Sequence, residues 1–433
     1  MRRRAALVVS LLLFSCSPAQ TPIIQPFAMP DVVMQADGET VYAFAGTDVL
    51  PFDVDLQTFV MPYWRCFSSR DLVHWYFESM LDPAETYMGK SNDCWASHGI
   101  KRHDQWYWYF SQRSISTGVA TARTPGGPWK DALGKPLLPA DISPTAEYDN
   151  CAFIDDDGLA YLVFGAGTYH IVELNEDMIS LKTKPQPLEI TGIPDGPQYQ
   201  RVDAPFLHKY NGAYYLSWRR PYAVSKFILG PYAFVGRHDA QGHGGFFKFK
   251  NQWFVNYTTL KTEENYRLRY RFCSLAYVHY KDDGSIAPME GIIRQHGVGQ
   301  YDAGWGDIQA EWHMGTTGAA LKKEISSGFE MRNLRAGDYL RFPNVHNVPR
   351  DAVIELKYSC GNPAGGRVSI RAYEPTGPEI GGADFRPTGS WDDYQSVSVP
   401  LDQNPPGTIS LALVFLGQPD GELLRLDSFR VRP

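Results

Sequence analysis

Short apolar strands, each entered through a polar turn, recur five times in the first two thirds of the chain. The five aromatic-rich stretches are 37–46, 103–111, 156–165, 211–219 and 250–258. Another short apolar stretch precedes each of them, and no long helical period separates them, which is the pattern of successive β-hairpins. We therefore predict an all-β domain. Closure as a five-bladed β-propeller leaves only short, protected sheet edges, and a β-sandwich of the same hairpins is the alternative.

The turns give these hairpins a common register. Counting back nine residues from the turn leads from Gly158 to Asp149, from Gly212 to Asp203, from Asp104 to Trp95 and from Gly38 to Met29. The innermost strands of a propeller line its axis, so equivalent positions of different blades face one central space. We therefore expect Asp149 and Asp203 at the rim of a central pocket.

Two carboxylates in one pocket can divide acid and base work, because different surroundings push their pKa values apart. Hydrolysis of a glycosidic bond requires such a pair. The alternative is that Asp149 and Asp203 only accept backbone hydrogen bonds where their strands begin. Their shared offset from two different turns favours the functional interpretation.

The pattern changes in the last third of the chain. A glycine-rich connection, 294–307, ends the hairpin repeat, and a second module begins near Ile308. Its short alternating strands predict an antiparallel β-sandwich of the jelly-roll type. The clearest of these strands are 338–345, 367–374, 409–417 and 423–431.

Composition and charge narrow the function. The 433 residues are 43% hydrophobic and 21% charged, with a net charge of −7, which indicates a globular protein rather than an integral membrane protein. No basic stripe is present of the kind that neutralises phosphates, so we expect no nucleic-acid partner. Dinucleotide, P-loop and common hydrolase motifs are also missing from the sequence.

The N-terminus is typical of an export signal. Three arginines precede an apolar run from Ala5 to Phe14 that is too short to span a bilayer. The sequence ending at Cys16 resembles a bacterial lipobox, which predicts a lipid-anchored protein in the periplasm or at the cell surface; cleavage after Ala19 is the alternative. The other five cysteines are scattered without metal-binding spacing.

Residues of about 25 to 290 resemble glycoside hydrolase family 43, the five-bladed arabinofuranosidases, xylosidases and arabinanases. The motifs that carry the resemblance are 67–75, 94–111, 117–131, 148–165, 173–180, 202–218 and 282–286. The resemblance implies inverting hydrolysis by a base, an acid and a third carboxylate that tunes the acid. Asp149 matches the tuning aspartate. Asp203 falls where the family places its acid, a glutamate, whose side chain is one methylene longer than that of aspartate.

The position of the base departs from the family pattern. Met29 stands in its place, both by the resemblance and by the internal register, and methionine cannot take a proton. Asp31 lies two residues further along the chain, displaced by roughly 7 Å at the rise of a strand. It is the best substitute for the base, and a supporting residue behind the catalytic groups is the alternative.

Further site residues follow from the same resemblance. His243 resembles a central histidine that supports a bound calcium or a water cluster; a cap on its glycine-rich turn is the alternative. Arg271 fits an arginine that reaches the active site from the last blade, with Arg267 and Arg269 nearby. Trp95 forms a sugar-stacking wall or packs between blades.

The second module resembles a family 6 carbohydrate-binding module over nearly all of 308–433. The segments that carry this resemblance are 308–313, 388–394 and 424–429. It implies that Trp391 stacks on sugar, with a core role as the alternative. It also implies that Glu311 and Asp427 contribute to a structural calcium, which takes oxygen ligands.

We therefore predict four segments: a signal and tether over 1–19, a propeller hydrolase domain over 20–293, the linker 294–307 and a carbohydrate-binding sandwich over 308–433. The expected activity is inverting hydrolysis of arabinofuranosyl or xylosyl units of an oligo- or polysaccharide by a monomer, with the lipid anchor as the only contact with membrane. A glycan-binding surface lipoprotein that has lost its catalytic base is the alternative.

Overall fold

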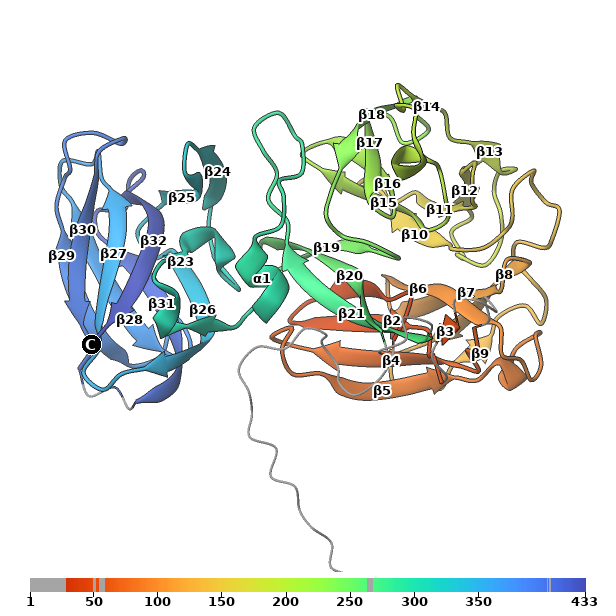
Figure 1. Ribbon diagram of the computed structural model, residues 1–433, viewed down its shortest axis with the longest axis horizontal. Coiled ribbons are helices and arrows are strands. Elements are labelled where there is room, and N and C mark those ends of the chain that lie inside the picture. Colours follow the sequence, from red (N-terminus) through yellow and green to blue (C-terminus); the bar gives the residue numbers. More distant parts are fainter. Residues whose placement is uncertain (1–28, 50–51, 54–58, 263–267, 403, 405) are drawn as a thin grey trace, which may run out of the picture.

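The computed structural model describes residues 29–433 except 50–51, 54–58, 263–267, 403 and 405. The predicted signal segment and Cys16 lie outside these residues. Among the described residues, no helix is long and apolar enough to cross a membrane. The chain is nearly all β, as predicted, and forms a ring of sheets beside a two-sheet sandwich (Figure 1).

Five sheets form the blades of the propeller. Blade one contains β1 (Val33–Asp37), β2 (Thr40–Ala45), β4 (Trp64–Ser69) and β5 (Tyr76–Leu81). Blade two contains β6 (Cys94–Arg102), β7 (Gln105–Gln112), β8 (Ser116–Ala122) and β9 (Lys130–Asp131) and follows the 3-10 turn η1 (Pro83–Glu85). Blade three contains β10 (Cys151–Ile154), β11 (Ala160–Phe164), β12 (His170–Leu174) and β13 (Gln186–Pro187).

The last two blades recruit strands from elsewhere in the chain. Blade four contains β15 (Pro205–Tyr210), β16 (Ala213–Trp218), β17 (Pro221–Ser225) and β18 (Tyr232–Arg237), with β14 (Ile190–Thr191) parallel to β18 and followed by the 3-10 turn η2 (Pro197–Tyr199). Blade five contains β19 (Gly245–Phe249), β20 (Gln252–Thr262) and β21 (Leu268–Tyr277). Its fourth strand, β3 (Phe52–Asp53), comes from the connection between β2 and β4, so the ring is closed by a strand that belongs to blade one in the sequence.

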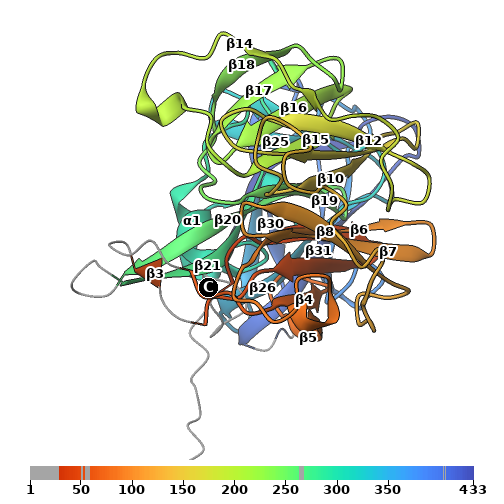
Figure 2. The ribbon, with the colours of Figure 1, turned by 90° about the vertical axis from the view of Figure 1, so that its right-hand side faces the viewer.

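The innermost strands β1, β6, β10, β15 and β19 contact one another in a closed circle. Each predicted aromatic stretch is the second strand of its blade, namely β2, β7, β11, β16 or β20. These strands are buried because sheets of adjacent blades pack on both of their faces; Phe44, Trp108 and Phe110, for example, are fully buried. The end-on view in Figure 2 shows the blades arranged around the axis.

The C-terminal domain is a sandwich of two antiparallel sheets, as predicted. One sheet contains β22 (Tyr301–Asp302), β26 (Tyr339–Val348), β31 (Gly407–Leu416), β28 (Gly366–Ala372) and β29 (Glu379–Phe385), with β22 pairing in parallel at its edge. The other contains β24 (Leu321–Ile325), β25 (Gly328–Leu334), β32 (Leu424–Arg432), β27 (Val353–Ser359) and β30 (Tyr394–Pro400), and β23 (Ile308–Gln309) also pairs with β32.

The connection between the domains is structured. It contains the end of the single helix in the described part of the chain, α1 (Gly291–His296), then β22, and the 3-10 turns η3 (Ala303–Trp305) and η4 (Ala310–Trp312) lie beside it. One hydrophobic core runs from the propeller into the sandwich. The hydroxyl groups of Tyr277 and Tyr301 lie 3.0 Å apart within it.

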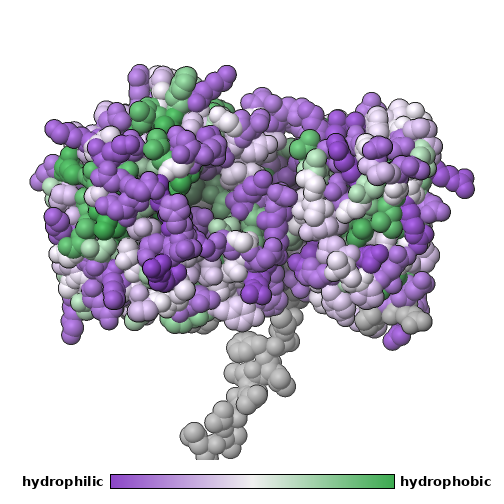
Figure 3. Space-filling model, turned by 180° about the vertical axis from the view of Figure 1, so that it is seen from behind, coloured by the Kyte–Doolittle hydropathy of each residue, from purple (hydrophilic) through white to green (hydrophobic). Residues whose placement is uncertain are grey.

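The outer surface is mainly hydrophilic in the view of Figure 3. Hydrophobic residues gather there in separate patches, most of them over the propeller half at the left of that view. This surface is typical of a protein that faces water over most of its area.

Candidate active site

A pocket of about 770 Å³ lies at one end of the propeller axis. Every blade contributes a lining residue from the start of its innermost strand: Asp31 before β1, Trp95 in β6, Asp149 before β10, Asp203 before β15 and His243 before β19. Residues that are far apart in the sequence therefore meet here.

A left-handed backbone recurs at the starts of three inner strands. The φ angles are 57° at Asp31, 54° at Asp149 and 62° at Ala204. Aspartate tolerates this region because its short polar side chain can bond locally, whereas alanine does so at a cost. Ala204 donates its backbone N–H to Oδ2 of Asp149 at 2.9 Å, which fixes the carboxylate between two blades.

His243 lies between two carboxylates. Its Nδ1 is 2.6 Å from Oδ1 of Asp31, and its Nε2 is 2.8 Å from Oδ2 of Asp149. Burial alone would lower the pKa of His243, but the two aspartates raise it well above its usual value. The imidazole is therefore a cation that bridges both carboxylates. Both ring nitrogens face carboxylates, and support of a calcium or a water cluster by His243 stays a prediction.

Arg271 joins the same group from β21. It forms two hydrogen bonds with Asp48, at 2.8 and 2.7 Å, and its Nη1 lies 3.3 Å from Oδ1 of Asp31. Burial raises the pKa of Asp31, but the charges of Arg271 and His243 outweigh it and hold that pKa well below the usual range. Asp31 is therefore ionised at neutral pH.

The other two carboxylates differ in their surroundings. Asp149 is buried, which raises the pKa of its carboxyl group, and the His243 charge offsets only part of this increase. Asp203 is about a quarter exposed and lies 2.6 Å from the Arg219 guanidinium, whose side chain is about half exposed. In the pocket, Asp31 is therefore ionised and paired with two cations, Asp149 is buried, and Asp203 lies at the edge.

Aromatic side chains form one wall. Trp95 contacts Tyr148 and Phe59 edge to face, with ring centroids 5.9 and 5.7 Å apart, and the Arg113 guanidinium lies 5.3 Å from its ring. Trp95 is half-buried and lines the pocket, so the pocket-wall position is observed. Its contact with sugar stays a prediction.

Met29 does not take the place assigned to it by the register. It is buried in the hydrophobic core, and Asp31 lines the pocket in its stead. The physical reason is that glycine occupies a different place in each turn. Gly38 is the first of two turn residues, Gly212 is the second of two, and Gly158 is the fourth of five. Equal distances from the glycines are therefore not equivalent positions.

Sequence reasoning missed Asp48 and Arg219. Asp48 follows β2 in a segment without a recognisable motif, and only its pairing with Arg271 shows its place. Arg219 follows β16 directly and could have been noticed as a cation opposite Asp203, because both residues flank the same hairpin of blade four.

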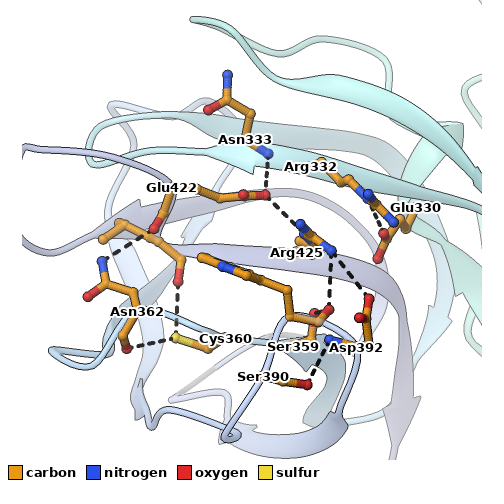
Figure 4. A network of polar contacts seen from close by, with 12 residues as sticks. Glu330, Arg332, Asn333, Ser359, Cys360, Asn362, Ser390, Asp392, Glu422 and Arg425 are labelled. Atoms are coloured by element: carbon orange, nitrogen blue, oxygen red, sulfur yellow. Dashed lines mark hydrogen bonds and ion pairs between the residues drawn. The ribbon is translucent and has the colours of Figure 1, made fainter.

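The predicted sugar-binding tryptophan of the sandwich is half-buried rather than exposed. The Arg425 guanidinium lies 4.9 Å from the ring of Trp391, and a Cβ atom on Gly361 would come within 2.6 Å of that ring. Arg425 also forms ion pairs with Glu422 and Asp392 (Figure 4). The Trp391 ring is thus partly covered, and one of its contacts is with a cation.

The two predicted calcium ligands of the sandwich have different partners. Oδ2 of Asp427 lies 3.0 Å from Lys357 Nζ and accepts a hydrogen bond from Ser428. Glu311 instead clusters with His279 and Glu290 at the domain junction. Burial raises the pKa of the Glu311 carboxyl well above its usual value. A shared calcium site of Glu311 and Asp427 is not formed by these contacts.

Carboxylates from three blades in one axial pocket, with a β-sandwich attached, define a two-domain protein of the glycosidase type. Residues 19–232 match the profile of glycosyl hydrolases family 43, and residues 309–433 match that of carbohydrate binding module family 6. The chain thus contains a family 43 domain and a family 6 module.

Similar proteins point the same way. The chain is 27% identical to the arabinoxylan arabinofuranohydrolase of Paenibacillus polymyxa over 84% of its length and spans 66% of that relative. It is 24% identical to the Bacillus subtilis enzyme of the same name, over 76% of the chain and 72% of the relative.

Solved structures share the fold. The family 43 arabinoxylan arabinofuranohydrolase from Bacillus subtilis, in complex with cellotetraose, covers 95% of this chain and 97% of its own, with 20% identity and a TM-score of 0.53. A β-xylosidase/α-arabinofuranosidase from a compost metagenome, in a calcium-free form with xylotriose, covers 63% of this chain and 97% of its own, with 20% identity and a TM-score of 0.52.

Proposed function

We propose that this protein is an inverting glycosidase that removes arabinofuranosyl or xylosyl units from a polysaccharide. The observation that carries the proposal is the convergence of Asp31, Asp149 and Asp203 on one pocket. Both relatives named arabinoxylan arabinofuranohydrolase support this substrate class.

In the proposed reaction, one proton is transferred on each side of the sugar. Asp31, held ionised by His243 and Arg271, takes a proton from water as the water oxygen bonds to the anomeric carbon. The glycosidic carbon–oxygen bond breaks, and Asp203 in its protonated form gives its proton to the leaving oxygen. Asp149 acts as a positioning residue, since it fixes both His243 and the backbone beside Asp203.

Asp31→Asn tests this assignment. The amide keeps the shape but cannot take the proton, so we expect turnover to fall by about 10²-fold or more while binding persists. The substrates are arabinofuranosylated and linear xylo-oligosaccharides, and proton NMR of the first product identifies its anomeric form. Asp37→Asn is the matched control because Asp37, at the far end of β1, pairs with Lys101 on the surface.

A non-catalytic glycan-binding protein is the second candidate. It is favoured by the charges in the pocket: Asp31 lies between two cations, and Asp203 faces Arg219. If the wild-type protein releases no sugar yet binds the same oligosaccharides in calorimetry, this candidate replaces the glycosidase. Full activity of Asp31→Asn would instead place the base elsewhere.

We also propose that the protein is exported and anchored by lipid on Cys16. The arginine-rich apolar N-terminus and its lipobox-like end support this proposal. Labelled palmitate should enter the wild-type protein expressed in a bacterium, and Cys16→Ala should remove the label and release the protein from the membrane fraction. Label retained in that variant contradicts the anchor.

A further inference from the structure

Three metal-binding side chains meet at the junction of the two domains. His279 follows β21 of the propeller, Glu290 caps the N-terminus of α1, and Glu311 lies in η4 at the start of the sandwich. One ligand atom from each lies within 4.8 Å of the others. The three residues thus come from the end of the propeller, the start of α1 and the start of the sandwich. α1 lies between the two domains in Figure 1.

The cluster contains carboxylate oxygens that lack a partner. Glu311 is 3% exposed, and its Oε2 accepts no hydrogen bond from any residue that the structure describes. Oε2 of Glu290 is also buried and unpartnered among those residues, while Oε1 lies 3.0 Å from Nε2 of His279. A buried carboxylate oxygen without a donor costs several kcal/mol unless a cation or proton meets it.

We propose that His279, Glu290 and Glu311 bind a divalent cation of the zinc type. One imidazole and two carboxylates form a three-ligand set that zinc accepts, with a fourth position left for water. The imidazole disfavours calcium, which prefers oxygen ligands. This site is separate from the calcium expected from Glu311 and Asp427, because the Asp427 carboxylate is engaged by Lys357.

Lys322 lies against this site and is compatible with it. Its Nζ contacts Gln252 Oε1 at 2.6 Å, the Val278 carbonyl at 2.9 Å and His279 Nδ1 at 2.8 Å. The amine thus occupies the Nδ1 side of the imidazole, and Nε2, the ring nitrogen that faces Glu290, is the one left for a metal. A metal ion bound there balances the negative charges of Glu290 and Glu311.

The site has an entry path. A pocket of about 470 Å³ is lined by Glu290, Glu311 and Trp312 together with the β24–β25 turn. The Glu290 side chain is about one quarter exposed. A cation can therefore enter from solvent, and once bound it ties three separate segments of the chain together.

Zinc titration of the full chain tests the site. After dialysis against a chelator, competition calorimetry should give one zinc per chain, and zinc should raise the unfolding temperature. His279→Gln and Glu290→Gln should each weaken zinc binding on the order of 10-fold or more. Of the two variants, Glu290→Gln should disturb the fold less, because the Glu290 side chain is partly exposed. The absorption spectrum of bound cobalt provides an independent readout of an imidazole ligand.

Glu324→Gln is the matched control, since Glu324 lines the same pocket outside the cluster and should keep wild-type affinity. Equal zinc affinity of Glu290→Gln and wild type overturns the site. So does calcium binding that Asp427→Asn abolishes and His279→Gln leaves intact. Because metal binding is measured without substrate, a missing hydrolase activity does not decide this outcome.

Discussion

Asp31 is controlled by the cations that surround it. In the folded protein its pKa is lowered, so its contribution to stability is present above its unfolded pKa of about 3.9 and is lost as the pH falls through that value toward the folded one. Arg271 and His243 cause this effect. The same neutralisation that stabilises the fold makes Asp31 a weaker base.

Arg271→Gln should weaken this pH dependence. Without the guanidinium, the pKa of Asp31 moves back toward its unfolded value, so the free energy of unfolding should fall less steeply below about pH 4. The substitution also leaves buried Asp48 unpaired, which should cost about 3–5 kcal/mol at neutral pH. Urea unfolding over a pH series measures both effects.

Arg271→Lys is the control for charge. It should restore part of the steep acid dependence, because a cation returns beside Asp31. An unchanged slope in Arg271→Gln would mean that His243 alone sets the pKa of Asp31.

At the scale of elements, the five hairpins could be predicted because their apolar pattern is local and directly reflects burial. The position of each site residue depended on the place of the glycine in its turn and on the length of the strand, which the sequence did not reveal. Gly38 and Gly212 occupy different places in turns of equal length, which shifts the register by one residue. β1 has five residues and β15 has six, which shifts it by a second residue, from Met29 to Asp31. The ion pairs of Asp31 join blade one to blade five, which are far apart in the sequence, so no local pattern contained them.

The loop that holds Trp391 leads to a binding prediction. Trp391→Ala should weaken polysaccharide binding by roughly tenfold, the size of one lost aromatic contact of about 1.4 kcal/mol, without changing turnover of a small soluble substrate. Affinity electrophoresis measures the binding.

Tyr373→Ala is the comparison for Trp391→Ala, because Tyr373 is 66% exposed on the same domain and lies outside this loop. Unchanged retardation of a folded Trp391→Ala would assign Trp391 to packing around Arg425.

At the scale of the whole molecule, the two domains share buried polar contacts as well as one core. Lys322 reaches from β24 of the sandwich to Gln252, Val278 and His279 of the propeller. The domains should therefore unfold together in calorimetry.

Lys322→Met should destabilise this joint unit. It leaves buried acceptors without a donor, at about 1–3 kcal/mol each, and should separate the unfolding into two transitions. Lys323→Met provides the control, since its exposed pair with Asp282 spans the same junction and is worth less than about 1 kcal/mol. A single unshifted transition in Lys322→Met would show that the apolar core alone couples the domains.

The strand that completes blade five has a consequence for the order in which this protein is made. β3 leaves the ribosome early, but its partner β21 is synthesised only after the other four blades. Until then the nascent propeller is an open arc with two unpaired edges, and long-range pairing of this kind is slow to form. Such delayed closure is compatible with the export proposed above, because an open chain can still be threaded through a membrane.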